Sequence, residues 1–271
     1  MKILRIALLL ILLVGAGCAP RSDEGLPELA AASFTASPAP TDTIDWFPAT
    51  GTPTPVSTRV ETTTPTPELG LSEVLLTDDF SQSGQMSVYK TANGSAAYGR
   101  KEFTLAVAAA RGYLTSLRSQ PELGDFYLEV SANPSLCREG DSYGLLLRAA
   151  NEWNYYRWVV TCSGETRLER VKDGFAVLLQ DWLYSAQIPQ GPEANLRLGV
   201  WMHGDQMRFF IDGVEQFDAR DPLWTSGLLG FFARAKGDTP LTVNFSDLSV
   251  RAIDPLALPS ETVMPSITSS P

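Results

Sequence analysis

Aromatic and charged side chains alternate with apolar side chains along several short segments of this sequence. In one of them Phe126 and Leu128 alternate with Tyr127 and Glu129, so the two sets point to opposite faces of an extended strand. Aromatic rings stack on the apolar faces of sugar rings, and arginine and glutamate hydrogen-bond sugar hydroxyls. We therefore predict a binding face, suited to carbohydrate, that carries Tyr127, Glu129, Arg148, Tyr155, Arg157, Arg197 and Trp201.

The same charged residues also support a plainer interpretation. Glu129, Arg148 and Arg157 would form cross-strand ion pairs on a solvated sheet, because opposite charges that face each other across strands attract. In that case the face would serve structure or protein interaction. The sequence leaves both alternatives open.

Few residues suit nucleophilic or metal-dependent catalysis. His203 is the one histidine of the chain and there is no C-x-x-C pair, which excludes a Cys/His metal cluster and leaves His203 as the sole base for a catalytic triad. Because His203 precedes Gly204 in an expected turn, we predict that it is solvated. No cofactor is expected beyond a structural calcium ion. Calcium prefers hard oxygen ligands. If the first and last strands pair, Asp78, Asp79 and Asp247 would come together and supply them.

Period-two alternation recurs in short runs that are broken by glycine and aspartate, which is the pattern of antiparallel strands. Hairpin turns are expected at 172–174, 203–206 and 212–213, and no amphipathic helix is expected. About a dozen strands favour two packed sheets. The predicted fold is all-β, a two-sheet antiparallel jelly-roll β-sandwich.

The flanking segments predict export and lipid anchoring. Lys2 and Arg5, an apolar run and a small-residue stretch form a secretory signal peptide over residues 1–17. Cys18 follows directly and resembles the lipidated cysteine of the bacterial lipobox, although Gly15 stands where leucine is commonest. The alternative is a plain secretory signal cut near Ala19. The prediction is a lipid-anchored protein of the cell membrane that faces outside the cytoplasm.

Composition divides the rest of the chain. Residues 18–70 are rich in Pro and Thr and are expected to be a disordered linker, and residues 254–271 a disordered tail. The β-sandwich domain is expected over residues 71–253. Its cysteines, Cys137 and Cys162, are an even pair in an exported domain and predict a disulfide.

Net charge excludes two classes of partner. The formal net charge is −10, and removal of Lys2 and Arg5 from the 21 basic residues leaves 19 against 31 acidic residues, or −12. Nucleic acids and anionic lipid surfaces are bound through positive potential, which such a chain lacks. Apart from the membrane reached through the lipid on Cys18, the expected partner is a glycan or an envelope protein.

Several strand motifs occur in a recognisable order along the domain. They are Asp125–Val130, Tyr143–Arg148, Asn195–Leu198, Phe209–Gly213, Gly227–Phe231 and Val243–Val250. In this order they resemble the concanavalin A-like lectin/glucanase superfamily, and within it the laminin-G-like and 3-keto-disaccharide hydrolase-type (DUF1080) domains of bacterial lipoproteins. Trp182 matches a family aromatic and is expected in the core or at the sandwich edge.

The resemblance implies the fold more strongly than an activity. Glucanases of the superfamily carry their catalytic carboxylates on one strand as E-x-D-x-x-E, whereas residues 127–131 offer only Glu129, so a second acid such as Glu169 would have to come from another strand. The expected function is therefore non-catalytic binding of carbohydrate or another cell-envelope ligand. The alternatives are a glycoside-modifying hydrolase of the 3-keto-disaccharide type and a structural or protein-interaction domain.

Overall fold

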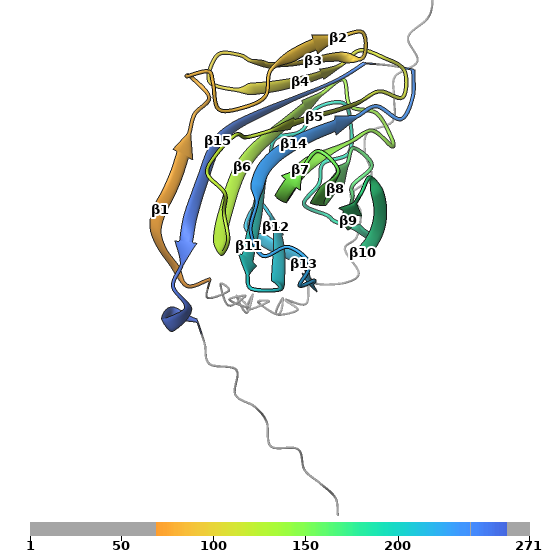
Figure 1. The fold of residues 1–271 in the computed structure, drawn as a ribbon. Helices are drawn as coiled ribbons and strands as arrows, with labels where there is room; N and C mark the ends of the chain where they lie inside the picture. The colour runs from red at the N-terminus through yellow and green to blue at the C-terminus, as the bar shows by residue number, and fades with distance from the viewer. Residues whose placement is uncertain (1–68, 239, 259–271) are drawn as a thin grey trace, which may run out of the picture. The chain divides into compact units, whose positions relative to one another are not determined.

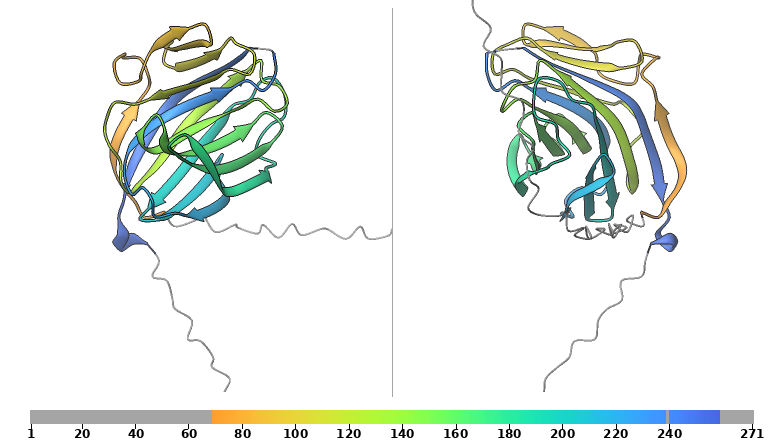
Figure 2. Two further views of the ribbon diagram at one scale, coloured as in Figure 1. Left: turned by 45° about the vertical axis from the view of Figure 1, so that its right-hand side comes forward. Right: turned by 180° about the vertical axis from the view of Figure 1, so that it is seen from behind.

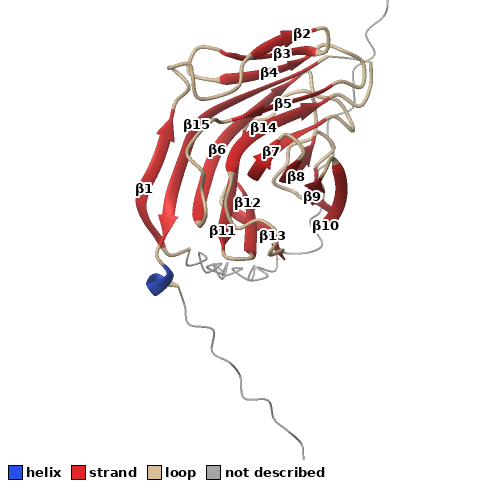
Figure 3. Ribbon diagram, viewed as in Figure 1, coloured by secondary structure: helices blue, strands red, loops and turns tan. Residues whose placement is uncertain are grey.

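A computed structural model describes residues 69–238 and 240–258, which form an all-β domain (Figure 3). The predicted signal peptide, the lipidated Cys18, the linker as far as residue 68 and the tail beyond residue 258 lie outside the described residues. The strands are β1 (Leu71–Asp78), β2 (Tyr89–Thr91), β3 (Gly94–Tyr98), β4 (Phe103–Val107), β5 (Tyr113–Leu117), β6 (Phe126–Ser135), β7 (Ser142–Asn151), β8 (Asn154–Thr161), β9 (Glu165–Lys172), β10 (Phe175–Tyr184), β11 (Leu196–His203), β12 (Gln206–Ile211), β13 (Val214–Arg220), β14 (Leu228–Arg234) and β15 (Leu241–Ile253).

The strands form two antiparallel sheets that lie face to face (Figures 1 and 2). The nine-stranded sheet has the order β13-β12-β11-β6-β15-β4-β3-β2, with β1 paired to β15. The six-stranded sheet has the order β10-β9-β8-β7-β14-β5. The predicted two-sheet antiparallel sandwich is therefore confirmed, as is the pairing of its first and last strands.

Alternation along the strands explains why the two sheets pack together. Phe126, Leu128 and Val130 of β6 point into the same core as Leu145 and Leu147 of β7, and all are buried. Burial of such side chains is the main stabilising term, about 1.5–3 kcal/mol for each fully buried one. Where a polar atom enters this core it finds a partner, as the Trp158 indole does by donating to Thr166 Oγ1 at 2.7 Å.

Two of the predicted hairpin turns have the backbone that their residues favour. Asp173-Gly174 joins β9 to β10 and Asp212-Gly213 joins β12 to β13, and all four residues have positive φ. Positive φ at both central positions is the type I′ geometry that matches the twist of a hairpin, and glycine adopts it without strain. These turns place β10 at one edge of the six-stranded sheet.

The two ends of the domain leave it at the same place. Leu71 lies opposite Ile253 where β1 and β15 pair, and the Asp254 amide donates to the Gly70 carbonyl at 2.7 Å. The only helix within residues 69–238 and 240–258 is the short 3-10 turn η1 (Pro255–Ala257). No helix in these ranges is long and apolar enough to cross a membrane.

Candidate functional site

The seven residues predicted to share one binding face lie on two different sheets. Tyr127 and Glu129 are on β6, and Arg197 and Trp201 are on β11, so this group belongs to the nine-stranded sheet. The second group, on β7 and β8 of the six-stranded sheet, consists of Arg148, Tyr155 and Arg157. Because the core separates the sheets, the prediction of a single face is wrong. For the same reason Glu129 and Glu169 do not form a carboxylate pair.

The group on the nine-stranded sheet is largely covered by the chain itself. Trp201 is 3% exposed, and its indole donates to the Leu69 carbonyl at 2.9 Å. The Tyr127 hydroxyl donates to Glu129 Oε1 at 2.9 Å, and burial is the main cause that raises the Tyr127 pKa. Glu129 also pairs with Arg197 at 3.0 Å, so ion pairing accounts for these charges.

Arg148 holds loops together and does not face solvent. It has a φ of +46° at a register irregularity of β7, which turns its side chain out of the alternation, and it is fully buried. Its guanidinium donates to the backbone carbonyls of Gly124, Gly204 and Trp224 at 2.7–3.2 Å. His203, which was expected to be solvated, is only about one third exposed, and its Nδ1 atom lies 2.9 Å from Asp125 Oδ2.

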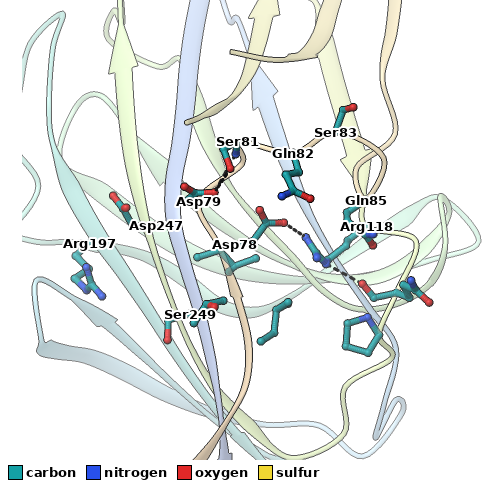
Figure 4. Close-up of a pocket in the computed structure, with 15 residues that line it drawn as sticks. Asp78, Asp79, Ser81, Gln82, Ser83, Gln85, Arg118, Arg197, Asp247 and Ser249 are labelled. Atoms are coloured by element: carbon teal, nitrogen blue, oxygen red, sulfur yellow. Dashed lines mark hydrogen bonds and ion pairs between the residues drawn. The ribbon is translucent and has the colours of Figure 1, made fainter. Parts of the chain in front are cut away.

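The predicted calcium ligands line one cavity of about 800 Å³ but are engaged elsewhere (Figure 4). Figure 4 shows the Asp78 carboxylate turned toward Arg118, which it meets at 2.5 Å. Asp79 accepts from the Ser81 amide and hydroxyl, and these bonds lower its pKa. Asp247 accepts from Ser246 at 3.0 Å. Within residues 69–238 and 240–258 no cluster of three His, Cys, Asp or Glu residues is arranged to hold a metal ion.

A second cavity, of about 540 Å³, lies on the outer face of the six-stranded sheet, and we call it the β10 cleft. Its strand residues alternate with core residues such as Trp158 and Leu168, so they point away from the sandwich interior. The cleft is lined by Glu139, Gly140, Ser142, Val159, Thr161, Ser163, Glu165, Arg167, Trp182, Tyr184, Gln190, Arg234 and Lys236.

Strand register shows how these residues are ordered across the β10 cleft. Arg234 of β14 pairs with Ser142, and Ser142 pairs with Thr161. The Glu165 amide donates to Thr161 Oγ1 at 3.0 Å, and Glu165 pairs with Tyr184 of β10. In the next row Gly144 pairs with Val159, which pairs with Arg167. The floor between the two ends includes the hydroxyl residues Ser142, Thr161 and Ser163. Cationic side chains lie at one end of the row and an aromatic side chain at the other.

The aromatic wall of the β10 cleft consists of Trp182 and Tyr184, which are 41% and 64% exposed. The Arg167 guanidinium carbon lies 4.2 Å from the centre of the Trp182 ring. This cation–π contact holds one face of the indole and leaves the side chain accessible. Of the two places expected for Trp182, the core is wrong and the sandwich edge is right, since it lies on the edge strand β10, where register shifts break the alternation between Leu178 and Leu183.

A buried carboxylate fixes the arginines beneath this wall. Glu169 is 2% exposed and pairs with both Arg157 and Arg167. Arg157 also donates to the Tyr113 hydroxyl at 3.2 Å, and burial is the main cause that raises the Tyr113 pKa. Arg157 is thus engaged within the sheet, and Tyr155 beside it is 4% exposed. Neither residue is among those that line the cleft.

The predicted disulfide is present and lies beside the β10 cleft. Cys137 and Cys162 are bonded, with Cα atoms 5.9 Å apart, and join the β6–β7 loop to the end of β8. Glu139, Gly140 and Ser163, which line the cleft, follow these cysteines directly. The crosslink therefore fixes the loop that forms one rim.

No protein-family model matches the chain, and no curated protein matches it. Solved structures do. A protein of unknown function with a galectin-like fold from Bacillus subtilis has a TM-score of 0.50 and 13% identity over 67% of this chain and 96% of its own. The carbohydrate-binding module CBM66 from Bacillus subtilis has a TM-score of 0.49, with 17% identity over 62% of this chain and 96% of that one. A Bacillus licheniformis β-glucanase has a TM-score of 0.49, with 8% identity over 66% and 98%.

At these identities the comparisons define the fold alone. The strand order and the match to the galectin-like structure define a two-sheet antiparallel β-sandwich. Proteins with this fold carry unrelated activities, so function has to be argued from the cleft.

Proposed function

We propose that this protein is a non-catalytic glycan-binding module whose ligand occupies the β10 cleft. The observation that carries the proposal is the pair of exposed rings, Trp182 and Tyr184, beside a polar floor that includes the partly exposed Ser163. Sugar rings have apolar faces that stack on such rings and hydroxyls that exchange hydrogen bonds with such a floor.

The cleft is also held in shape before a ligand arrives. Arg167 stacks on Trp182, Glu169 fixes Arg167, and the disulfide fixes the adjacent loop. A preformed site avoids the entropy of ordering side chains on binding. Its openness and polar floor fit an oligosaccharide better than a small apolar ligand.

We further propose that a lipid on Cys18 anchors the module outside the cytoplasm and that residues 18–70 act as its stalk. The support is the signal-like order of residues 1–17 and the Pro/Thr-rich composition that follows. The disulfide agrees with an oxidising compartment. Replacement of Cys18 by serine should move the protein from the membrane fraction to the soluble fraction after cell lysis. Retention of the variant in the membrane would contradict the anchor.

The binding proposal is tested on a glycan array with the purified protein and its Trp182→Ala variant. Loss of the ring should weaken binding at least about tenfold, which corresponds to about 1.4 kcal/mol. Trp153→Ala is the matched control, because Trp153 is 63% exposed and does not line the cleft. Binding that Trp182→Ala leaves unchanged would contradict this site, and absence of any glycan ligand would favour a structural or protein-interaction role.

A further inference from the structure

Two exposed cations lie together at one end of the β10 cleft, where Glu139 beside Gly140 also lines it, whereas Arg167 lies at the aromatic end over Trp182. Arg234 ends β14 and Lys236 follows two residues later, so both cations lie at the β14 end. Glu165 lies toward the opposite end, next to Tyr184 on β10, and accepts from the Ser163 hydroxyl at 3.3 Å. The cleft therefore has a cationic end and an aromatic end.

Within residues 69–238 and 240–258, the two cations have no carboxylate partner. Among the residues that the structure describes, no Asp or Glu oxygen lies within 4.0 Å of the charged groups of Arg234 or Lys236. Most arginines that the sandwich holds in place, such as Arg118 and Arg157, do have one. Both side chains are also exposed, so a ligand in the cleft can reach them.

The backbone beside Lys236 directs its side chain along the rim of the cleft. Its amide donates to the buried Asp141 at 2.8 Å, which fixes the start of the residue. Gly140 leaves room for the aliphatic stem, since a Cβ atom there would lie 2.4 Å from Lys236 Cδ. The Lys236 side chain therefore lies against Gly140 of the β6–β7 loop, and its backbone is held by Asp141.

We infer that the ligand is an acidic glycan, with a carboxylate or sulfate group at Arg234 and Lys236 and a sugar ring at Trp182. The inference rests on the proposed function and names its ligand class. Four strand spacings separate β14 from β10, which is roughly 19 Å at about 4.8 Å each. A chain of several sugars is needed to contact both ends.

The net charge of −10 does not oppose this inference at physiological salt. The Debye length there is about 8 Å, so exposed acidic residues beyond that distance are largely screened from the ligand. Arg234 and Lys236 can still attract an anionic group of the ligand, because charge-assisted hydrogen bonds form at direct contact. An ion pair at an exposed site is itself partly screened by salt, so binding should weaken as the salt concentration rises.

The test is a glycan array that carries neutral glycans and uronate-containing, sialylated and sulfated glycans. The purified protein is compared with Trp182→Ala, with a double variant Arg234→Ala/Lys236→Ala, and with a control double variant Lys90→Ala/Arg100→Ala. The control removes two exposed cations that do not line the cleft. All four proteins are compared at two salt concentrations after their folding has been checked by circular dichroism.

The inference predicts that acidic glycans are the preferred ligands and that the Arg234/Lys236 variant binds them roughly tenfold to a hundredfold more weakly. The control variant should bind as the parent does. Equal binding of neutral and acidic glycans that requires Trp182 but not the cations would overturn the acidic ligand and leave the proposed function standing. Absence of glycan binding, or binding that Trp182→Ala does not change, would overturn both.

Discussion

Replacement of Arg148 by alanine should destabilise the domain strongly. Arg148 is not among the residues that line the β10 cleft. The side chain is fully buried and donates to three backbone carbonyls, those of Gly124, Gly204 and Trp224. A carbonyl left without a donor inside a protein costs about 1–3 kcal/mol. Because water can enter part of the vacated space, we take values near the lower end of that range. The loss of unfolding free energy should then be about 3–5 kcal/mol.

Urea denaturation followed by tryptophan fluorescence measures this loss. With a slope of about 2 kcal/mol per molar urea, the midpoint should fall by roughly 2 M. Arg208→Ala is the matched control, since Arg208 pairs with Glu215 in a partly exposed ion pair that should contribute about 1 kcal/mol or less. If Arg148→Ala shifts the midpoint no more than Arg208→Ala does, the reasoning that Arg148 holds the three loops together is wrong.

Three further outcomes follow from buried groups. Glu169→Gln should lower the unfolding free energy by about 3 kcal/mol, because Arg157 and Arg167 then lack their shared carboxylate, and urea denaturation checks this. Replacement of both bonded cysteines by serine should lower it by about 3.5 kcal/mol for a sequence separation of 25, and an unchanged midpoint would contradict this. Buried tyrosines whose folded pKa lies above the ordinary value stabilise the domain fully below pH 10, and this stability is lost as the pH rises further. These tyrosines are Tyr113, Tyr127, Tyr143 and Tyr156. Absorbance at 295 nm should therefore show their ionisation together with alkaline unfolding. Ionisation well before unfolding would contradict their burial.

The strand pattern was predictable because alternation reflects burial on one face of a sheet. Residues 128–131 alternate between buried and partly exposed side chains. Residues 143–147 are all buried, with Tyr143, Leu145 and Leu147 in the main core and Leu146 in a separate cluster. Two short strands were not predicted. The strand β2 has only three residues, and β3 is rich in small residues, so neither shows a clear apolar period. Their pairing depends on β4, which lies later in the chain.

The site was less predictable, because alternation tells which face a side chain is on but not which sheet. Tyr127 and Tyr155 have the same local pattern yet lie on separate sheets. Arg148 departs from the alternation because its φ is positive, and no sequence motif indicates this. Trp182 reached the surface through register shifts in β10. A detectable signal was the aromatic pair Trp182 and Tyr184 on an edge strand, which suggested a surface role only once the hairpin partner β9 was known.

The most direct test of the central claim is an NMR titration that follows the tryptophan indole N–H signals. The titrant is the best glycan from the array, and Trp182→Ala assigns its signal among those of the six tryptophans of the chain. Binding in the β10 cleft predicts that the Trp182 signal shifts in proportion to saturation while the buried Trp158 and Trp201 signals stay in place. A glycan that binds and leaves the Trp182 signal unmoved would contradict the account.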